Sequence, residues 1–249
     1  MSGHSKWATI KHQKGAKDKA RGKLFAKLIR QLEVAAREGG GDIEANPTLR
    51  TMYTKARAAS VPMDTIERAI KRGTGELEGV VYESVSYEGY APAGVAVLVE
   101  VLTDNRNRTA SDIRNIFTKN GGSMAEPGAV SWQFSRKGVI IAAGSASEDD
   151  VMAAALDAGA DDIVDDGDSW RVTCEPQDVE SVRAALEAAG ITVDSAEATM
   201  VSSTAVPLEN AEDAKKVLRV MDALEDHDDV QNVYSNFDIP DAILETVEA

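Results

Sequence analysis

The stretch from Gly138 to Met200 constrains the fold more than any other part of the chain. Its apolar patterning predicts strands at 139–143, 162–164, 169–174 and 192–200, with helices at 147–158 and 176–189. In chain order this is strand, helix, strand, strand, helix, strand, the β-α-β-β-α-β pattern of a ferredoxin-like unit. The sequence therefore predicts a small and complete α/β domain at this position.

The segments on either side predict a second α/β domain, which the first one interrupts. Before it come an alternating strand at 81–88, a nearly continuous apolar strand at 95–102, a helix at about 109–120 and a strand in "AVSWQF". Thr109 and Asp112 are predicted to cap that helix. The missing half follows the insert, as a strand near 201–206, a helix at 210–224 and the strand "VQNVYSN". One larger mixed sheet is the alternative that the same alternation allows.

The N-terminal part predicts helices instead. Apolar residues recur at helical spacing from Leu24 to Ala36, and the glycines at 39–41 end this pattern. Asn46 and Pro47 have the residue types of an N-cap and a first helical position, and Gly73 to Gly75 end a third helix. The predicted fold class is therefore α+β, with a helical domain (1–79), a discontinuous ferredoxin-like domain (80–136 plus 201–249) and an inserted acidic ferredoxin-like domain (137–200).

Charge is divided unevenly along the chain, whose formal net charge is −15. Residues 1–75 carry 16 Lys and Arg against 7 Asp and Glu, whereas residues 76–249 carry 11 against 35. The first 30 residues contain nine cations and a single carboxylate, Asp18. Such cation density favours binding to a polyanion, and the acidic remainder would orient the protein on it. A solvated helix face is the alternative interpretation.

Residues that could build an enzyme site are scattered. His4, His12 and His227 lack the spacing of metal ligands, and the groups "GGGD" and "GTGE" lack the pattern of a phosphate-binding loop. Cys174 is the single cysteine, so it can form no internal disulfide, and we predict an inert, partly buried thiol. We therefore expect no enzyme, no catalytic residue, no metal site, no cofactor and no small-molecule substrate.

The sequence also predicts a cytoplasmic location. The N-terminus lacks the apolar region of a secretory signal, and no stretch approaches the roughly 18 uncharged apolar residues of a membrane span. We expect no membrane partner.

Two segments carry side chains suited to nucleic acid. In "SKWATIKHQKGAKDKARGKLF", ammonium groups can neutralise phosphates while a ring stacks on an unpaired base. The predicted contact residues are Lys6, Trp7, Lys11, His12, Lys14, Lys17, Lys19, Arg21, Lys23, Lys27 and Arg30. Trp7 can equally anchor the segment to its own domain. The second segment is the loop "DNRNRT", with Asp104, Asn105, Arg106, Asn107 and Arg108, whose alternative role is to cap the following helix.

Several motifs together resemble the YebC/PmpR family, which is similar to the mitochondrial translational activator of cytochrome c oxidase. They are "GHSKWATIKHQKGAKDKARGKLFAKLIRQLEVAAREGGGD", "NPTLRTMYTKARAASVPMDTIERAIKRGTGE", "YEGYAPAGVAVLVEVLTDNRNRTASDIRNIF" and "NGGSMAEPGAVSWQF". The resemblance spans nearly the whole chain. It implies a helical domain followed by two α/β domains, one inserted in the other. Gln13 departs from it, because a basic residue is often expected there.

Two functions come with this resemblance. Members are described as probable DNA-binding transcriptional regulators and as ribosome-associated translation factors that relieve stalling, notably at proline-rich stretches. By position, the N-terminal segment would be the main nucleic-acid contact and "DNRNRT" a second functional loop. The expected partner is promoter DNA or ribosomal RNA, with the ribosome itself. A protein-interaction adaptor, whose acidic domains recruit a partner, is the alternative.

Overall fold

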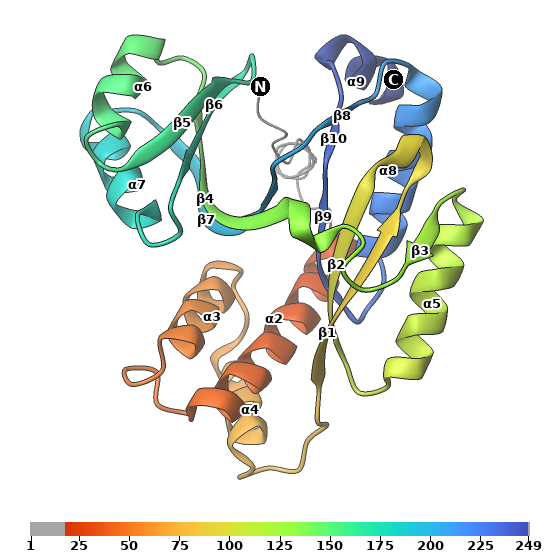
Figure 1. Cartoon of the computed structure of the whole chain (residues 1–249). Helices are drawn as coiled ribbons and strands as arrows, with labels where there is room; N and C mark the ends of the chain where they lie inside the picture. The colour runs from red at the N-terminus through yellow and green to blue at the C-terminus, as the bar shows by residue number, and fades with distance from the viewer. Residues whose placement is uncertain (1–17, 249) are drawn as a thin grey trace. The chain divides into compact units, whose positions relative to one another are not determined.

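The computed structural model describes residues 18–248, and of residues 18–21, 241, 244, 245 and 248 it describes the backbone only (Figure 1). Contacts divide the described chain into two compact units. Unit 1 comprises residues 132–206 and 235–238, and unit 2 comprises residues 18–131, 207–234 and 239–248. Each unit is described by itself below.

Unit 2 begins with the three predicted helices, α2 (Asp18–Gly39), α3 (Pro47–Ala58) and α4 (Met63–Thr74). The Asn46 side chain accepts the Leu49 N–H and so caps α3, as predicted. Gly75 ends α4 with φ 83°, a conformation that glycine adopts without steric cost. A core of apolar side chains holds the three helices together, among them Leu32, Leu49 and Ile66.

The sheet of unit 2 follows in the chain. It has the strand order β3-β1-β2-β9, with β1 (Glu83–Tyr90), β2 (Ala96–Thr103), β3 (Ser123–Ala125) and β9 (Val230–Ser235). A short 3-10 turn, η1 (Pro92–Gly94), joins β1 to β2, which pair antiparallel from Glu83↔Thr103 to Tyr90↔Ala96. The helices of this part are α5 (Arg106–Lys119), α8 (Ala211–Glu225) and α9 (Asp241–Glu248). α5 contacts β1, β3 and α8.

A buried carboxylate fixes the loop that ends the first segment of unit 2, at residues 128–131. Glu88 is 6% exposed, and its carboxylate accepts the backbone N–H groups of Gly128 (2.7 Å), Val130 (2.6 Å) and Ser131 (2.8 Å). Burial alone would raise the pKa of Glu88, but these hydrogen bonds outweigh it and hold that pKa below its ordinary value. The charged form of Glu88 therefore orders the loop from which the chain enters unit 1.

Unit 1 has the ferredoxin-like order predicted for it. β4 (Phe134–Ala143), α6 (Glu148–Ala155), β5 (Ala160–Asp165), β6 (Ser169–Cys174), α7 (Val179–Ala188) and β7 (Val193–Ser202) follow in sequence. Their sheet has the order β5-β6-β4-β7, and its core contains Ile140, Val151, Val172 and Leu186. β8 (Val206–Pro207) and β10 (Phe237–Asp238) form a separate two-stranded sheet. Cys174 is buried in β6, and burial raises the pKa of its thiol to about 11.

The predicted α+β class, with a helical region followed by sheet domains, is confirmed. The alternative of one larger mixed sheet is wrong, because the strands of the described residues form separate sheets. The boundaries at 79/80, 136/137 and 200/201 stay a prediction.

Three local predictions are wrong. The strand expected near 201–206 does not join the sheet of unit 2, because β7 extends to Ser202 within the sheet of unit 1 and Val206 belongs to β8. "AVSWQF" is not one strand: the 3-10 turn η2 (Ser131–Gln133) occupies its middle, and Phe134 already belongs to β4. Asn105, not Thr109, caps α5, because its side chain accepts the Arg108 N–H at 3.1 Å. The Thr109 hydroxyl is instead buried and donates to Asp229.

Candidate nucleic-acid interface

The structure describes only part of the predicted N-terminal contact. Lys6, Trp7, Lys11, His12, Lys14 and Lys17 lie outside the described residues, and the structure gives only the backbone of Lys19 and Arg21, in the first turns of α2. Lys23, Lys27 and Arg30 are described with their side chains. Their spacing of four and three residues places them on one face of α2.

These three cations contact the segment in which α8 ends. Lys23 Nζ donates to the Asp226 carbonyl oxygen (2.9 Å) and to Asp226 Oδ1 (2.8 Å), and Lys27 Nζ donates to the Glu225 carbonyl oxygen (3.1 Å). The last carbonyls of a helix have no intrahelical partner and form its negative end. Lys23 and Lys27 therefore satisfy the C-terminus of α8, so a phosphate at these lysines would have to displace these contacts.

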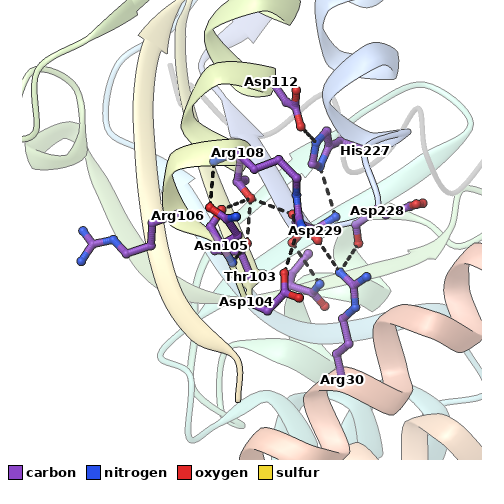
Figure 2. Close-up of polar contacts among 12 residues, drawn as sticks. Arg30, Thr103, Asp104, Asn105, Arg106, Arg108, Asp112, His227, Asp228 and Asp229 are labelled. Carbon is purple, nitrogen blue, oxygen red and sulfur yellow. Dashed lines mark hydrogen bonds and ion pairs between the residues drawn. The ribbon is translucent and has the colours of Figure 1, made fainter. Parts of the chain in front are cut away.

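Arg30 binds the next residues of the same segment (Figure 2). Its Nη1 donates to the Asp228 carbonyl oxygen (2.6 Å) and to Asp229 Oδ1 (2.9 Å). The guanidinium also lies 5.4 Å from the ring centroid of Tyr82. Arg30 thus contacts three residues of unit 2: Tyr82, Asp228 and Asp229.

Asp229 joins three elements through one carboxylate (Figure 2). Its side chain is 5% exposed, and its Oδ2 accepts hydrogen bonds from Arg108 (2.9 Å) and from the Thr109 hydroxyl (2.7 Å). Burial alone would raise the pKa of Asp229, but the bonds from Thr109 and Arg108 and the charges of Arg30 and Arg108 outweigh it and lower that pKa. Asp229 is therefore charged, and it ties α2 and the start of α5 to β9.

His227 completes this network. Its Nδ1 accepts the Asp229 N–H at 3.1 Å, and its Nε2 lies 3.4 Å from Asp112 Oδ2. Because Nδ1 accepts a hydrogen bond, the ring proton is on Nε2 and points to Asp112. His227 thus has a structural environment. In the described part of the chain, no group of three or more His, Cys, Asp and Glu side chains is arranged to hold a metal ion.

The second predicted loop has mixed roles. Asn105 caps α5, while Arg108 binds Asp104 (2.8 Å) and Asp229, so these side chains are occupied by local structure. Asp104 lies in this loop as the partner of Arg108. Arg106 and Asn107 are exposed, and among the described residues the Arg106 guanidinium forms one ion pair, with Glu83 at 3.9 Å. The loop therefore presents Arg106 and Asn107 to solvent.

An open depression of about 740 Å³ lies where these groups meet. Its lining includes three cations and five carboxylates, namely Lys23, Arg30, Arg108, Asp104, Asp112, Asp226, Asp228 and Asp229. A polyanion is not attracted to a surface with this excess of negative charge. The acidic segment 225–229 is what sequence reasoning missed, and the only signal for it is the local run "EDHDD".

Comparisons with known proteins cover the whole chain. Residues 5–76 match the family described as "TACO1/YebC protein N-terminal domain", and residues 82–237 match "TACO1/YebC second and third domain". A "probable transcriptional regulatory protein" of Syntrophobacter fumaroxidans is 56% identical over 99% of this chain and 100% of its own. One with the same name from Thermobifida fusca is 58% identical over 98% of both chains.

A solved structure is also similar. The crystal structure of a conserved hypothetical protein, Aq1575, from Aquifex aeolicus matches with a TM-score of 0.77 and 45% sequence identity. The match covers 90% of this chain and 92% of that one.

In the described part of this chain, no helix has the length and apolar character that crossing a membrane requires.

Proposed function

The chain belongs to the TACO1/YebC family, and from this premise we propose that it is a non-enzymatic regulator of gene expression that acts by binding nucleic acid. The names of its relatives support a regulatory role in general. The observation that carries nucleic-acid binding is the charge of the first 30 residues, nine cations against one carboxylate in a chain of net charge −15. Cations gathered in this way neutralise phosphates and release counterions.

The proposed contacts fall into two groups. Lys6, Lys11, Lys14, Lys17, Lys19 and Arg21 bind phosphates, while Trp7 and His12 offer rings for stacking. Lys23, Lys27 and Arg30 form the second group, because each already has partners in segment 225–229. They join the contact only when a phosphate replaces those partners.

RNA is the favoured polymer. Sequence-specific DNA binding ordinarily places base-reading side chains in the major groove, whereas the N-terminal segment is rich in lysine, which contacts phosphates. Folded RNA is recognised largely through its shape and its phosphates. The proposed setting is ribosomal RNA, where the protein would act as a ribosome-associated translation factor relieving stalling at proline-rich stretches. Binding to promoter DNA is the other outcome.

The test replaces Lys11, Lys14, Lys17 and Lys19 by Ala together and measures affinity for RNA and DNA at several salt concentrations. If the wild-type segment contacts four phosphates through these lysines, the slope of log affinity against log salt is shallower in the variant by about 3 for single strands and about 4 for duplex DNA. Affinity at low salt falls accordingly. A variant with wild-type affinity and slope contradicts the proposal.

Crosslinking in growing cells, followed by sequencing of the attached nucleic acid, identifies the polymer. Mainly ribosomal RNA supports the translation role, and discrete promoter sites support the transcription role. If the variant keeps its protein partners and its cellular effect while nucleic-acid binding is lost, the protein is an adaptor whose acidic domains recruit the partner.

A further inference from the structure

Helix α5 has an unusual charge for its place in the chain. Residues 106–119 contain four cations, Arg106, Arg108, Arg114 and Lys119, against Asp112 alone. The remainder of residues 76–249 carries 7 cations against 34 carboxylates. A third of the cations in this acidic part of the chain therefore lie on one helix.

The exposed face of α5 is free of carboxylates. Thr109, Ile113 and Phe117 are buried and face the body of unit 2. The exposed residues of the helix beyond Arg108 are Ser111, Arg114, Asn115, Thr118 and Lys119, and Asn107 precedes them in its first turn. Asp112 is half-buried and directed to His227. The outer face is thus composed of cations and short polar side chains, on the helix drawn beside β3 in Figure 1.

Two of these cations have no anionic partner among the described residues. Arg108 is bound to Asp104 and Asp229, and Arg106 lies near Glu83. Arg114 and Lys119, by contrast, form no ion pair with any other residue that the structure describes. On other helices, cations lie among carboxylates: Arg183 of α7 pairs with Glu180 and Glu187, and Lys216 of α8 pairs with Glu212. Lys215 and Arg219 of α8 form no ion pair with another described residue, but their helix also carries four carboxylates. The outer face of α5 differs because no carboxylate accompanies its cations.

We propose that the exposed face of α5 is a second nucleic-acid contact, which binds the sugar-phosphate backbone of RNA. Arg114 and Lys119 bind phosphates, with Arg106 at the start of the helix. Asn107, Ser111, Asn115 and Thr118 are short donors and acceptors that suit the 2′-hydroxyls of the wide, shallow minor groove of A-form RNA. B-DNA offers no 2′-hydroxyl, so these side chains can distinguish RNA from DNA. This inference rests on the proposed function, because α5 binds the same kind of polymer as the N-terminal segment.

The test is the double variant Arg114→Gln/Lys119→Gln, measured against a short RNA duplex and the DNA duplex of the same sequence. Loss of two phosphate contacts weakens RNA binding about tenfold at about 100 mM salt and makes the salt slope shallower by about 2. Arg114→Lys/Lys119→Arg keeps the charge and retains the slope. Both positions are exposed, so the melting temperature of each variant stays that of the wild type.

The matched control is Lys215→Gln/Arg219→Gln on α8, which removes the same charge from an exposed helix face in the same unit. Its affinity for RNA stays within about twofold of the wild type. If the α5 variant behaves like this control while the N-terminal lysine variant loses binding, the α5 contact is overturned and the proposed function stands. If only DNA binding falls, the assignment to RNA is overturned. If the wild type binds neither duplex and no single-stranded RNA, both proposals fall together.

Discussion

At the scale of single residues, the carboxylate of Asp229 connects two helices to the start of β9. Asp229 accepts hydrogen bonds from Arg30, Arg108 and Thr109, which belong to α2 and α5. Hydrogen bonds to a charged group are worth about 1.5 to 3 kcal/mol each when the group is buried. Because the three donors converge on one side chain, their contributions are lost together when it changes.

Asp229→Asn should destabilise the protein by about 2 to 4 kcal/mol at pH 7, because the amide cannot balance two guanidinium groups. The pKa of Asp229 is lower in the folded state than its ordinary value near 4, so this stabilisation is fully present above about pH 4 and is lost as pH falls through the folded-state pKa. Urea unfolding at pH 7 and at about pH 3 should therefore show a gap between wild type and variant that narrows with acid.

Asp228→Asn is the control for this experiment. Asp228 is adjacent and exposed, and it contributes its carbonyl oxygen, not its carboxylate, to Arg30. Its replacement should change the free energy of unfolding by less than about 0.5 kcal/mol. If the difference in the free energy of unfolding between the wild type and Asp229→Asn is the same at about pH 3 as at pH 7, Asp229 does not act through its charge.

At the scale of elements, local signals located most helices and strands, and tertiary contacts decided the exceptions. Asn46 and Gly75 mark helix ends through their own backbone and side-chain chemistry, so their roles are readable from sequence. The start of α5 was misplaced by three residues because Thr109, a good capping residue by type, is taken by Asp229, 120 positions away. α9 was missed altogether.

The packing of α4 on α2 depends on a glycine within α4. A Cβ at Gly73 would collide with the Glu33 carbonyl oxygen and lie 2.7 Å from Ala36 Cβ. Gly73→Ala should therefore cost about 1 to 3 kcal/mol through overpacking, despite the better helix propensity of alanine. The measurement is the free energy of unfolding in urea.

Gly22→Ala is the matched control, because a Cβ at Gly22 of α2 meets nothing within 4 Å. There the propensity term acts alone, so stability should rise by about 0.5 to 1 kcal/mol. If the two variants change stability equally, the close approach of α4 to α2 at Gly73 is refuted.

At the scale of the whole molecule, positive and negative charges are separated along the chain, but the fold brings some of them together as ion pairs. The split between a cationic start and an acidic remainder is visible in the sequence. The pairing of Lys23 with Asp226, 203 positions later, is not, because no local spacing relates residues so far apart. The candidate contact could thus be predicted as a segment, whereas the cations already engaged could be identified only from the fold.

Because segment 225–229 already binds Lys23, Lys27 and Arg30, it should compete with nucleic acid for these cations. Asp226→Asn/Asp228→Asn removes two carboxylates near Lys23 and Arg30 and leaves Asp229 in place. Affinity for RNA should rise about threefold or more, with a steeper salt slope, because Lys23 becomes available to phosphate and repulsion decreases. The same salt titration measures it. Unchanged affinity and slope would exclude Lys23 from the contact.

The discontinuity of unit 2 has a consequence for synthesis on the ribosome. The sheet of unit 1 is contiguous in the chain, from Phe134 to Ser202, so all its strands emerge in one stretch. The sheet of unit 2 receives its last strand, β9, only at residues 230–235, long after β2 has been made. At a synthesis rate of about 5 to 20 residues per second, roughly 6 to 25 seconds pass between the synthesis of β2 and that of β9. The nascent chain therefore completes the sheet of unit 1 before the sheet of unit 2, and the edge of β2 that pairs with β9 stays unpaired during the interval.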